Sequence, residues 1–461
     1  MITRSTFRRR VGLVVAGAII TGSLAACATQ GGGSNTDPLD CANATPTEAD
    51  ADTKVTLDFW MLPLLEGPYG ERDGGAEDWG NRIIEEFEAK YPNVTVKQEM
   101  LSYDGYDQKI KTAIASGTMP DVVLAGGMFG GAQKYAALGA LDPINCFVTD
   151  EDRADFTSAA IDLMSYEGEE YFWPLETLVS GVVVNLDMAE AAGATDLLPL
   201  GDDQVEWTFE QFEEFAAAIN AVAPDQYAYP VWGKDAAFYD ALWVVNAGGT
   251  FVDDSLTSFV GDQNPATAEG FDYLASLPEQ GFAPPGAAGL SFGDTYNLFL
   301  QQKIAMFPVF GLSEIQQGVA DSGNPFDIGV VAPPHAEGVA TSAWTNSAGF
   351  MVFKQTDNYE RFLANEFARM LTSTEENMVV ASALQVFPAR TSANSAIEDN
   401  ESIEPFLKLL PFANPQFTRE YGLINATDWE NAIQGVLTGT TTGQQAVESL
   451  KQPMTDALNA R

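Results

Sequence analysis

The stretch SYDGYDQKIKTAIASGTMPDVVLAGG (residues 102–127) contains two secondary-structure signals in succession. KIKTAIASG has the small and apolar residues of a helix, and Gly117 closes it. PDVVLAGG is a short apolar run that ends in glycines, as a buried strand does. The stretch therefore predicts a helix followed directly by a strand.

The preceding residues extend this pattern toward the N-terminus. VTLDFW (55–60) alternates apolar and polar residues and predicts a strand. NRIIEEFEAKY (81–91) predicts a helix that Pro92 ends, and VTVKQEM (94–100) resumes strand alternation. Strand, helix, strand, helix, strand is a βαβ pattern, so we expect an α/β protein with a mostly parallel sheet.

Further elements follow toward the C-terminus. EYFWPLETLVSGVVVN (170–185) is a long extended stretch, and Thr208-x-x-Gln211 is a capping box that opens a helix. The last clear helix begins near Asp428 and Trp429. Four more runs are strand-like, the last of them followed by a helix: 242–252, 301–311, 326–334 and 348–353.

Length and charge limit the class of protein. A chain of 461 residues exceeds what one hydrophobic core usually supports, so two lobes are expected. The formal net charge of −42 argues against nucleic acid or an anionic lipid surface as a partner, because both require a basic face. Such an excess is more typical of solubility or a saline habitat than of a binding site.

The N-terminus has the form of an export signal. Four arginines precede the apolar run VGLVVAGAII, which is shorter than the roughly 20 residues of a spanning helix. Leu24-Ala25-Ala26-Cys27 resembles the bacterial lipobox, in which cleavage leaves an acylated cysteine as the new N-terminus. We expect a signal peptide (1–26) and a flexible tether (27–53); an ordinary signal peptide is the alternative.

The cysteines fit an oxidising compartment. If Cys27 is acylated, Cys41 and Cys146 remain as a pair. A disulfide between them is the favoured interpretation, and two free thiols are the alternative.

The sequence offers little for catalysis. His335 is the one histidine, and it lies in the turn-like PPHAEG. No Cys-x-x-Cys, His-Glu-x-x-His, Walker or Gly-x-Ser-x-Gly motif is present, so we expect no enzyme activity, no cofactor and no metal site. A pair among the 65 acidic residues could still hydrolyse glycosides, which keeps a hydrolase as the alternative.

Several motifs in order resemble the extracellular solute-binding proteins of ABC importers, of the maltose and oligosaccharide type. They are Phe59-Trp60, Tyr91-Pro92-Asn93-Val94, Gly117-x-x-Pro120-Asp121-Val122-Val123, Leu138-Gly139-Ala140-Leu141, Tyr166-x-Gly168 with Pro174, Asn185, Lys303-x-Ala305-Met306 and Pro388-Ala389. The resemblance covers about 54–460.

The resemblance implies a periplasmic-binding-protein-like fold, in which a three-crossing hinge joins two α/β lobes with a ligand cleft between them. The crossings are expected near 173–178, 330–336 and 373–385. Lobe 1 would comprise 54–175 plus 331–375, and lobe 2 would comprise 176–330 plus 376–461.

The resemblance also implies a function. The chain would be a monomeric, lipid-anchored receptor on the outer face of the cytoplasmic membrane that delivers a mono- or oligosaccharide to an ABC permease. Met128, Phe129 and Leu312 depart from the pattern of maltodextrin binders and argue against maltose itself. A receptor for a peptide, an amino-acid derivative or a polyol, and a sensor or adhesin of the same fold, are the alternatives.

Sugars present apolar faces and hydroxyl groups, so a sugar cleft needs aromatic rings and hydrogen-bonding side chains. For each tryptophan, core packing is the alternative. Asp121 is expected to cap backbone amides rather than to bind ligand. The candidate ligand-binding residues are Trp60, Glu66, Glu176, Trp232, Trp243, Phe310, Trp344, Asn346, Arg390 and Trp429.

Overall fold

The structure is a computed structural model. It describes residues 41, 46–47, 50–64, 74–102, 106–125, 131–201, 205–235, 237–398 and 400–459. The predictions for the signal peptide, for Cys27 and for Glu66 lie outside these residues. Cys41 and Cys146 form a disulfide, with their Cα atoms 5.3 Å apart.

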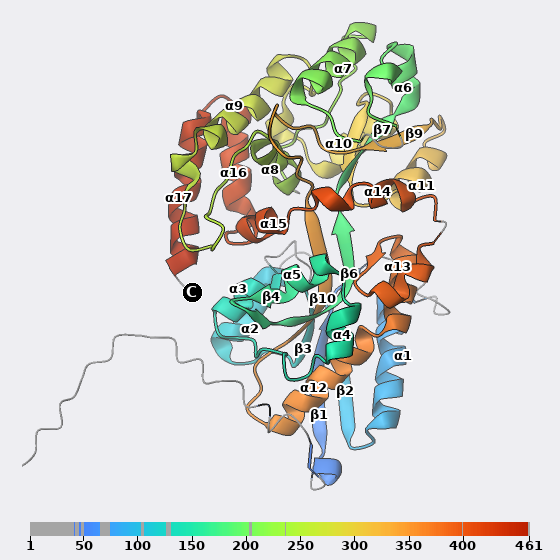
Figure 1. Cartoon of the computed structure of the whole chain (residues 1–461), viewed down its shortest axis with the longest axis vertical. Helices are drawn as coiled ribbons and strands as arrows, with labels where there is room; N and C mark the ends of the chain where they lie inside the picture. Colours follow the sequence, from blue (N-terminus) through green and yellow to red (C-terminus); the bar gives the residue numbers. More distant parts are fainter. Residues whose placement is uncertain are drawn as a thin grey trace, which may run out of the picture. The chain divides into compact units, whose positions relative to one another are not determined.

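A six-stranded sheet forms the first half of the fold, in the order β11-β6-β10-β3-β1-β2 (Figure 1). β1 pairs in parallel with β2 and β3, whereas β10 and β11 join the sheet through antiparallel pairs. The prediction of a mostly parallel sheet is therefore wrong, because only the N-terminal βαβ units contribute parallel pairs. The strands are β1 (Val55–Met61), β2 (Val94–Met100), β3 (Val122–Ala125), β6 (Phe172–Val179), β10 (Thr345–Val352) and β11 (Phe387–Pro388).

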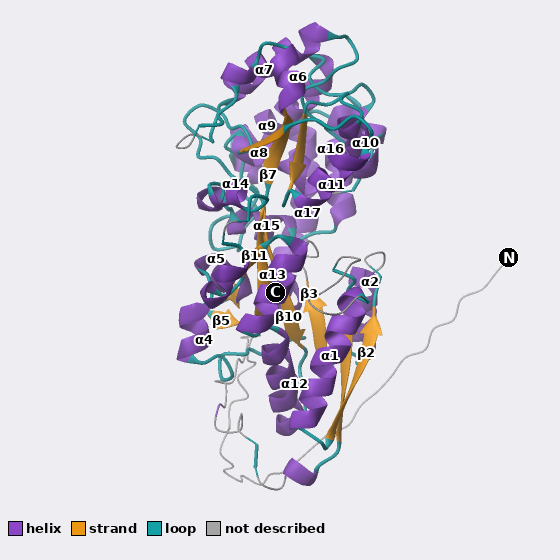
Figure 2. Cartoon of the chain, turned by 90° about the vertical axis from the view of Figure 1, so that its right-hand side faces the viewer, coloured by secondary structure: helices purple, strands orange, loops and turns teal. Residues whose placement is uncertain are grey.

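Helices cover this sheet and form its core. The predicted helices around 81–91 and 109–117 are confirmed as α1 and α2. Phe59 of β1 lies fully buried, with its ring 5.1 Å from that of Phe367 on α12. Figure 2 shows α1 and α12 along the strands. The helices are α1 (Gly75–Lys90), α2 (Tyr106–Ser116), α12 (Asn358–Leu371) and α13 (Thr374–Leu384).

The second half is built on a three-stranded antiparallel sheet, in the order β8-β7-β9. The strand predictions at 301–311 and 326–334 are confirmed as β8 (Met306–Val309) and β9 (Ile328–Val331), which flank β7 (Gly181–Asn185). The capping box at Thr208 is also confirmed. Helices enclose this sheet: α6 (Leu186–Ala191), α7 (Phe209–Val222), α8 (Ala237–Asn246), α9 (Pro265–Glu279), α10 (Phe292–Leu300), α11 (Ser313–Asp321), α16 (Ala426–Leu437) and α17 (Gly443–Asn459).

Two sequence predictions fail in this half. The strand expected at 242–252 is not formed: residues 242–246 are the second half of helix α8, all of whose residues are buried, and a turn follows. A helix buried on every side has no polar face, so its apolar run cannot be told from a strand by periodicity. The helix near Asp428 is confirmed as α16, but it is not the last, since α17 follows it.

Ser180 links β6 directly to β7, so one extended segment runs from the first sheet into the second. The lobe boundaries stay proposals. Val380 and Leu384 of α13 pack in the core of the first sheet, so we place the last boundary after Val386 rather than at 375. Shorter elements complete the chain: α3 (Gly131–Ala137), α4 (Asp150–Asp155), α5 (Ser158–Met164), β4 (Ser165–Tyr166), β5 (Glu169–Glu170), α14 (Glu404–Leu407) and α15 (Pro415–Tyr421).

Candidate functional site

The candidate site begins on the strand pair β6 and β10. In their antiparallel register Glu176 lies opposite Ala348, and Asn346 lies opposite Leu178. Residues opposite each other, and residues two apart, share one face of a sheet. Glu176 and Asn346 therefore project from the same face, although 170 positions separate them in the sequence.

Both side chains are buried, and each leaves a polar atom without a protein partner. Glu176 and Asn346 are each 4% exposed, and neither Glu176 Oε2 nor Asn346 Oδ1 accepts a hydrogen bond. The Nε1 of the fully buried Trp344 also lacks a partner. Burying an unpaired polar group costs about 1–3 kcal/mol, so each such group in a folded protein calls for an explanation.

Burial also changes the charge of Glu176. With no compensating partner, desolvation raises the pKa of its carboxyl from 4.5 to about 7. Near neutral pH the group is therefore divided between the acid, which can donate a hydrogen bond, and the carboxylate, which can only accept.

An aromatic cluster adjoins these polar groups. The ring of Trp344 lies 4.7 Å from that of Phe238 and 5.1 Å from that of Tyr421. Phe310, in turn, lies 5.9 Å from Phe238 and 5.5 Å from Tyr239. Aromatic faces beside hydrogen-bonding oxygens can hold a molecule that has both apolar faces and hydroxyl groups.

A second buried carboxyl lies behind the cluster on α8. Asp240 is fully buried, and its Oδ2 accepts a hydrogen bond from the backbone N–H of Trp232 at 3.3 Å. Its Oδ1 has no partner, and burial raises the pKa of the carboxyl well above its usual value. Three of the four unpartnered atoms of the site are therefore oxygens of Glu176, Asn346 and Asp240.

The structure thus brings four predicted residues together: Glu176, Phe310, Trp344 and Asn346. Two more lie one layer behind them. Trp232 packs edge-on against Tyr239 at 6.0 Å, and Trp429 stacks on Tyr421 at 5.1 Å. Both are fully buried, so any effect they have on ligand passes through the rings in front of them.

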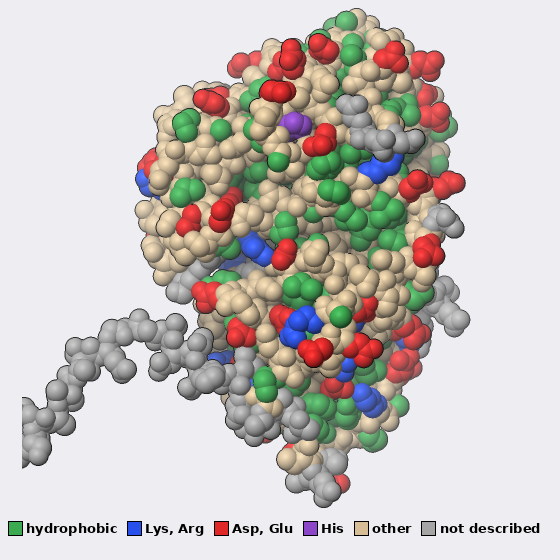
Figure 3. All heavy atoms as spheres, in the orientation of Figure 1, with side chains coloured by type: hydrophobic (Ala, Val, Ile, Leu, Met, Phe, Trp, Pro, Cys, Tyr) green, Lys and Arg blue, Asp and Glu red, His purple; other side chains and the backbone are tan. Residues whose placement is uncertain are grey.

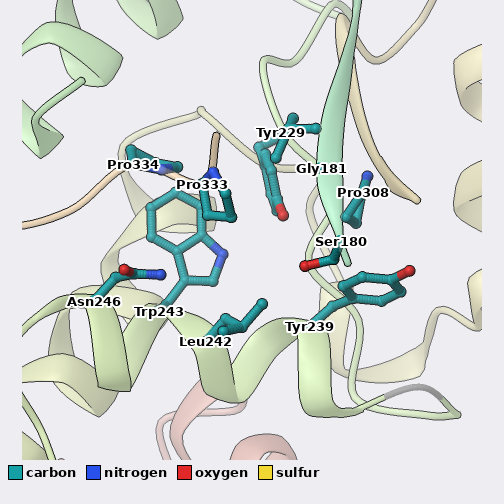
Figure 4. A pocket seen from close by; sticks show the side chains of 11 residues that line it. Ser180, Gly181, Tyr229, Tyr239, Leu242, Trp243, Asn246, Pro308, Pro333 and Pro334 are labelled. Carbon is teal, nitrogen blue, oxygen red and sulfur yellow. The ribbon is translucent and has the colours of Figure 1, made fainter. Parts of the chain in front are cut away.

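Trp243 lies elsewhere, packed edge-on against Tyr229 with ring centroids 5.0 Å apart. It lines a cavity of about 10 Å³ together with Tyr229, Ser180 and Asn246 (Figure 4). That volume is about enough for a single water molecule and too small for a sugar.

Two other predicted residues also lie apart from the cluster. Trp60 is the penultimate residue of β1 and is half-buried, with Lys109 Nζ 4.3 Å from its ring. Arg390 is 5% exposed and pairs with Asp152 at 2.9 Å and Asp155 at 3.3 Å. Because its guanidinium is already engaged by carboxylates, we assign Arg390 a structural role.

The sequence analysis missed Phe238, Tyr239, Asp240 and Tyr421. The first three lie on α8, where the strand interpretation hid the helix. Their signal in the sequence is the run FYD at 238–240, with two aromatic rings and a carboxyl just inside a helix.

Two other kinds of feature are missing from the described part of the chain. Among the described residues, no group of three His, Cys, Asp or Glu side chains could hold a metal ion, and no helix is long and apolar enough to cross a membrane. Acidic side chains are scattered over the face seen in Figure 3 rather than gathered at one place.

The chain is similar in sequence to known bacterial binding proteins. Residues 74–378 match the family model described as bacterial extracellular solute-binding protein. A binding protein of Brucella abortus is 23% identical over 321 residues, which are 69% of this chain and 72% of the relative. The diacetylchitobiose binding protein DasA of Streptomyces coelicolor is 23% identical over 399 residues, 84% of each chain.

Solved structures share the fold. The GacH receptor of Streptomyces glaucescens has a TM-score of 0.68 at 20% identity, over 88% of this chain and 99% of the receptor. The predicted two-lobed α/β architecture is thereby confirmed. The chain belongs to the family of bacterial extracellular solute-binding proteins.

Proposed function

We propose that the chain is a receptor that captures a mono- or oligosaccharide between its lobes and delivers it to an ABC permease. The observation that supports this most is the set of unpartnered polar atoms of Glu176, Trp344 and Asn346 beside an aromatic cluster. The names of similar proteins point the same way, since they include receptors for diacetylchitobiose and acarbose.

The chemistry of the site favours an uncharged, hydroxyl-rich ligand. The unpartnered atoms of Glu176 and Asn346 are oxygens, and a sugar hydroxyl can donate a hydrogen bond to each of them. Among the described residues, neither Glu176 nor Asp240 forms a salt bridge that would offset an added negative charge. A uronic acid or a sugar phosphate would therefore find no compensating positive charge at either carboxyl.

Binding would act on the balance between open and closed lobes. Glu176 lies on β6, whose chain continues through Ser180 into the second sheet, while Phe238 and Phe310 belong to that second half. A ligand that touches both sets gains contacts only when the lobes close, so it shifts the population toward the closed form. The permease would recognise that form, and no bond of the sugar would be broken.

The N-terminal prediction completes this proposal. Acylation of Cys27 would hold the receptor at the outer face of the membrane, and the tether 27–53 would keep it within reach of the permease. Labelled palmitate should enter the wild-type chain and not Cys27→Ala, which should be released from the membrane fraction. Equal labelling of both would refute the anchor and leave the receptor proposal standing.

A thermal-shift screen tests the solute class. The full chain would be purified in detergent and freed of bound solute by unfolding and refolding, then mixed with neutral sugars, uronic acids, sugar phosphates, polyols, peptides and amino acids. A ligand at a hundred times its Kd stabilises the folded state by about 2.7 kcal/mol. Stabilisation by a neutral sugar supports the proposal, and stabilisation only by peptides or amino acids refutes it.

The hydrolase alternative is separated by recovering the sugar. After prolonged incubation with an excess of the stabilising oligosaccharide, mass spectrometry should find it intact. Progressive cleavage that scales with protein concentration would instead establish an enzyme.

A further inference from the structure

A second, larger pocket lies on the other side of the strands that carry the candidate solute site. Its volume is about 470 Å³, within the range of small-molecule sites. Its walls are the start of α5, the strand segments at Thr177 and Thr345, Phe387 of β11, and the 394–413 segment that includes Leu407 and Leu410.

The strand register separates this pocket from the solute site. Thr177 lies opposite Ser347 on one side and Phe387 on the other, whereas Glu176 lies opposite Ala348 and Pro388. Because successive side chains of a strand point to opposite faces, Thr177 faces the pocket while Glu176, which does not line it, faces away. Phe387 lines the pocket together with Pro388, which ends the short edge strand β11. The two sites are therefore divided by the sheet itself.

A buried hydroxyl in this pocket lacks a partner. Thr177 is 3% exposed, and its Oγ1 makes no hydrogen bond, whereas the hydroxyl of Thr345 in the same wall donates to the carbonyl of Leu178 at 2.8 Å. An unsatisfied buried hydroxyl that lines a roomy pocket points to a ligand with a polar group at that position.

The rest of the lining fixes the character of that ligand. Leu407 and Leu410 are 45% and 37% exposed, two of the few large apolar side chains that the described residues leave open to solvent. Neutral polar side chains, among them Thr157, Ser158 and Asn394, complete the lining, and Glu398 is the only charged side chain among the described residues of the pocket. Apolar and neutral polar walls with a single carboxylate favour an apolar body joined to a positively charged group.

We propose that this pocket is a second binding site, for a small amphiphilic amine whose apolar body contacts Leu407, Leu410 and Phe387. Its ammonium group pairs with Glu398, and a polar hydrogen of the ligand is donated to Thr177 Oγ1. The site is distinct from that of the proposed sugar and does not depend on the sugar being the solute.

Calorimetric titration of the full chain in detergent tests the site, with detergent alone as the blank. The probes are 2-phenylethylamine, 2-phenylethanol and 3-phenylpropionate, which share an aromatic body and differ in charge. We expect the amine to bind about fivefold more tightly than the alcohol, and the acid to give no binding. Equal binding of all three, or binding of none, would overturn the proposal.

Matched variants locate the binding. Glu398→Gln should bring the amine to the affinity of the alcohol, while Glu401→Gln, an exposed neighbour outside the pocket, should change nothing. Thr177→Val keeps the side-chain shape and should weaken binding of the amine about fivefold, which is the loss expected for one hydrogen bond. Far-ultraviolet circular dichroism confirms that each variant is folded.

Two results contradict the assignment. If Glu398→Gln and Glu401→Gln weaken amine binding equally, the attraction is one of general surface charge. Alternatively, Glu176→Gln could abolish amine binding while Thr177→Val leaves it intact, which would place the amine in the solute site. Sugar binding is measured separately, so failure of this proposal is distinguishable from failure of the receptor function.

Discussion

Glu176 and Thr177 are neighbours on β6, yet their side chains lie on opposite faces of the sheet, and each has a buried oxygen without a protein partner. Glu176 faces the side of Asn346, and Thr177 lines the 470 Å³ pocket. One strand therefore presents an unpartnered polar group on each face of the sheet, one beside the aromatic cluster and one in the pocket.

This adjacency predicts that the two sites are coupled. The pocket is bounded both by α5 and by the 394–413 segment, so an occupant constrains elements on either side of the strand pair. We expect saturating 2-phenylethylamine to change the sugar Kd by about fivefold or more, the usual lower range for coupled sites. Calorimetric titration of sugar with and without the amine measures this, and an unchanged Kd would exclude coupling.

The buried carboxyl of Glu176 predicts how stability depends on pH. Its pKa is about 7 in the folded chain against 4.5 for the free side chain, so between these values the folded state keeps a proton that the unfolded state loses. Stability should therefore fall as pH rises from about 4.5 to about 7, by roughly 3 kcal/mol from this group, and level off above that.

Urea unfolding of the ligand-free chain across this pH range measures the slope. Glu176→Gln should remove part of it, and Glu420, whose pKa is also raised to about 7, should account for a remaining part. The exposed Glu401→Gln is the control. If Glu176→Gln has the wild-type slope, Glu176 does not titrate as a buried acid.

Asp121 illustrates a residue of the family pattern that acts on the fold. Its Oδ2 accepts a hydrogen bond from the backbone N–H of Asp58 at 2.7 Å, and its Oδ1 accepts one from the side-chain amide of Gln355 at 2.6 Å. Asp121→Ala should cost about 2 kcal/mol of unfolding free energy, because two donors lose their acceptor. The sugar Kd should stay as in wild type, and a tenfold weaker Kd at unchanged stability would assign Asp121 to the ligand site instead.

Arg390 should likewise affect stability rather than binding. Its side chain is 6% exposed and pairs with Asp152, which is 7% exposed. Arg390→Met should cost about 3 kcal/mol or more, because Asp152 and Asp155 lose their buried partner and only the more exposed Arg369 still contacts Asp152. Arg369→Met is the matched control: Arg369 contacts the same aspartate at 3.1 Å but is 39% exposed, so its loss should cost about 1 kcal/mol or less.

These two unfolding measurements are paired with a sugar titration of each variant. If Arg390→Met binds the sugar more weakly than wild type but is no less stable than Arg369→Met, Arg390 is a ligand-binding residue after all.

Local sequence patterns predicted the local structure well where they were amphipathic. Phe59 and its neighbours alternate in burial along β1 as the sequence alternates, and the capping box at Thr208 opens α7. The motifs around Gly117 and Asp121 fixed the fold class because a helix and a strand follow each other in a known order.

The site itself could be predicted only in part. Glu176 was predicted because it lies in the first expected lobe crossing, and Trp344 and Asn346 were predicted because they directly precede the expected strand at 348–353. Phe238 and Asp240 were missed because a helix buried on all sides has no periodic signal. The antiparallel pairing of β6 with β10 joins segments about 170 residues apart, and no local pattern records such a pairing.

The most direct test of the receptor site is calorimetric titration of a stabilising neutral sugar into wild type, Glu176→Ala and Asn346→Ala, with the exposed Glu401→Gln as a control away from the cluster. Each of the first two variants should bind at least about fivefold more weakly, because each loses a hydrogen bond to a ligand hydroxyl, and the control should bind as wild type. Wild-type affinity in both Glu176→Ala and Asn346→Ala would contradict the account, since the unpartnered oxygens would then have no part in holding the solute.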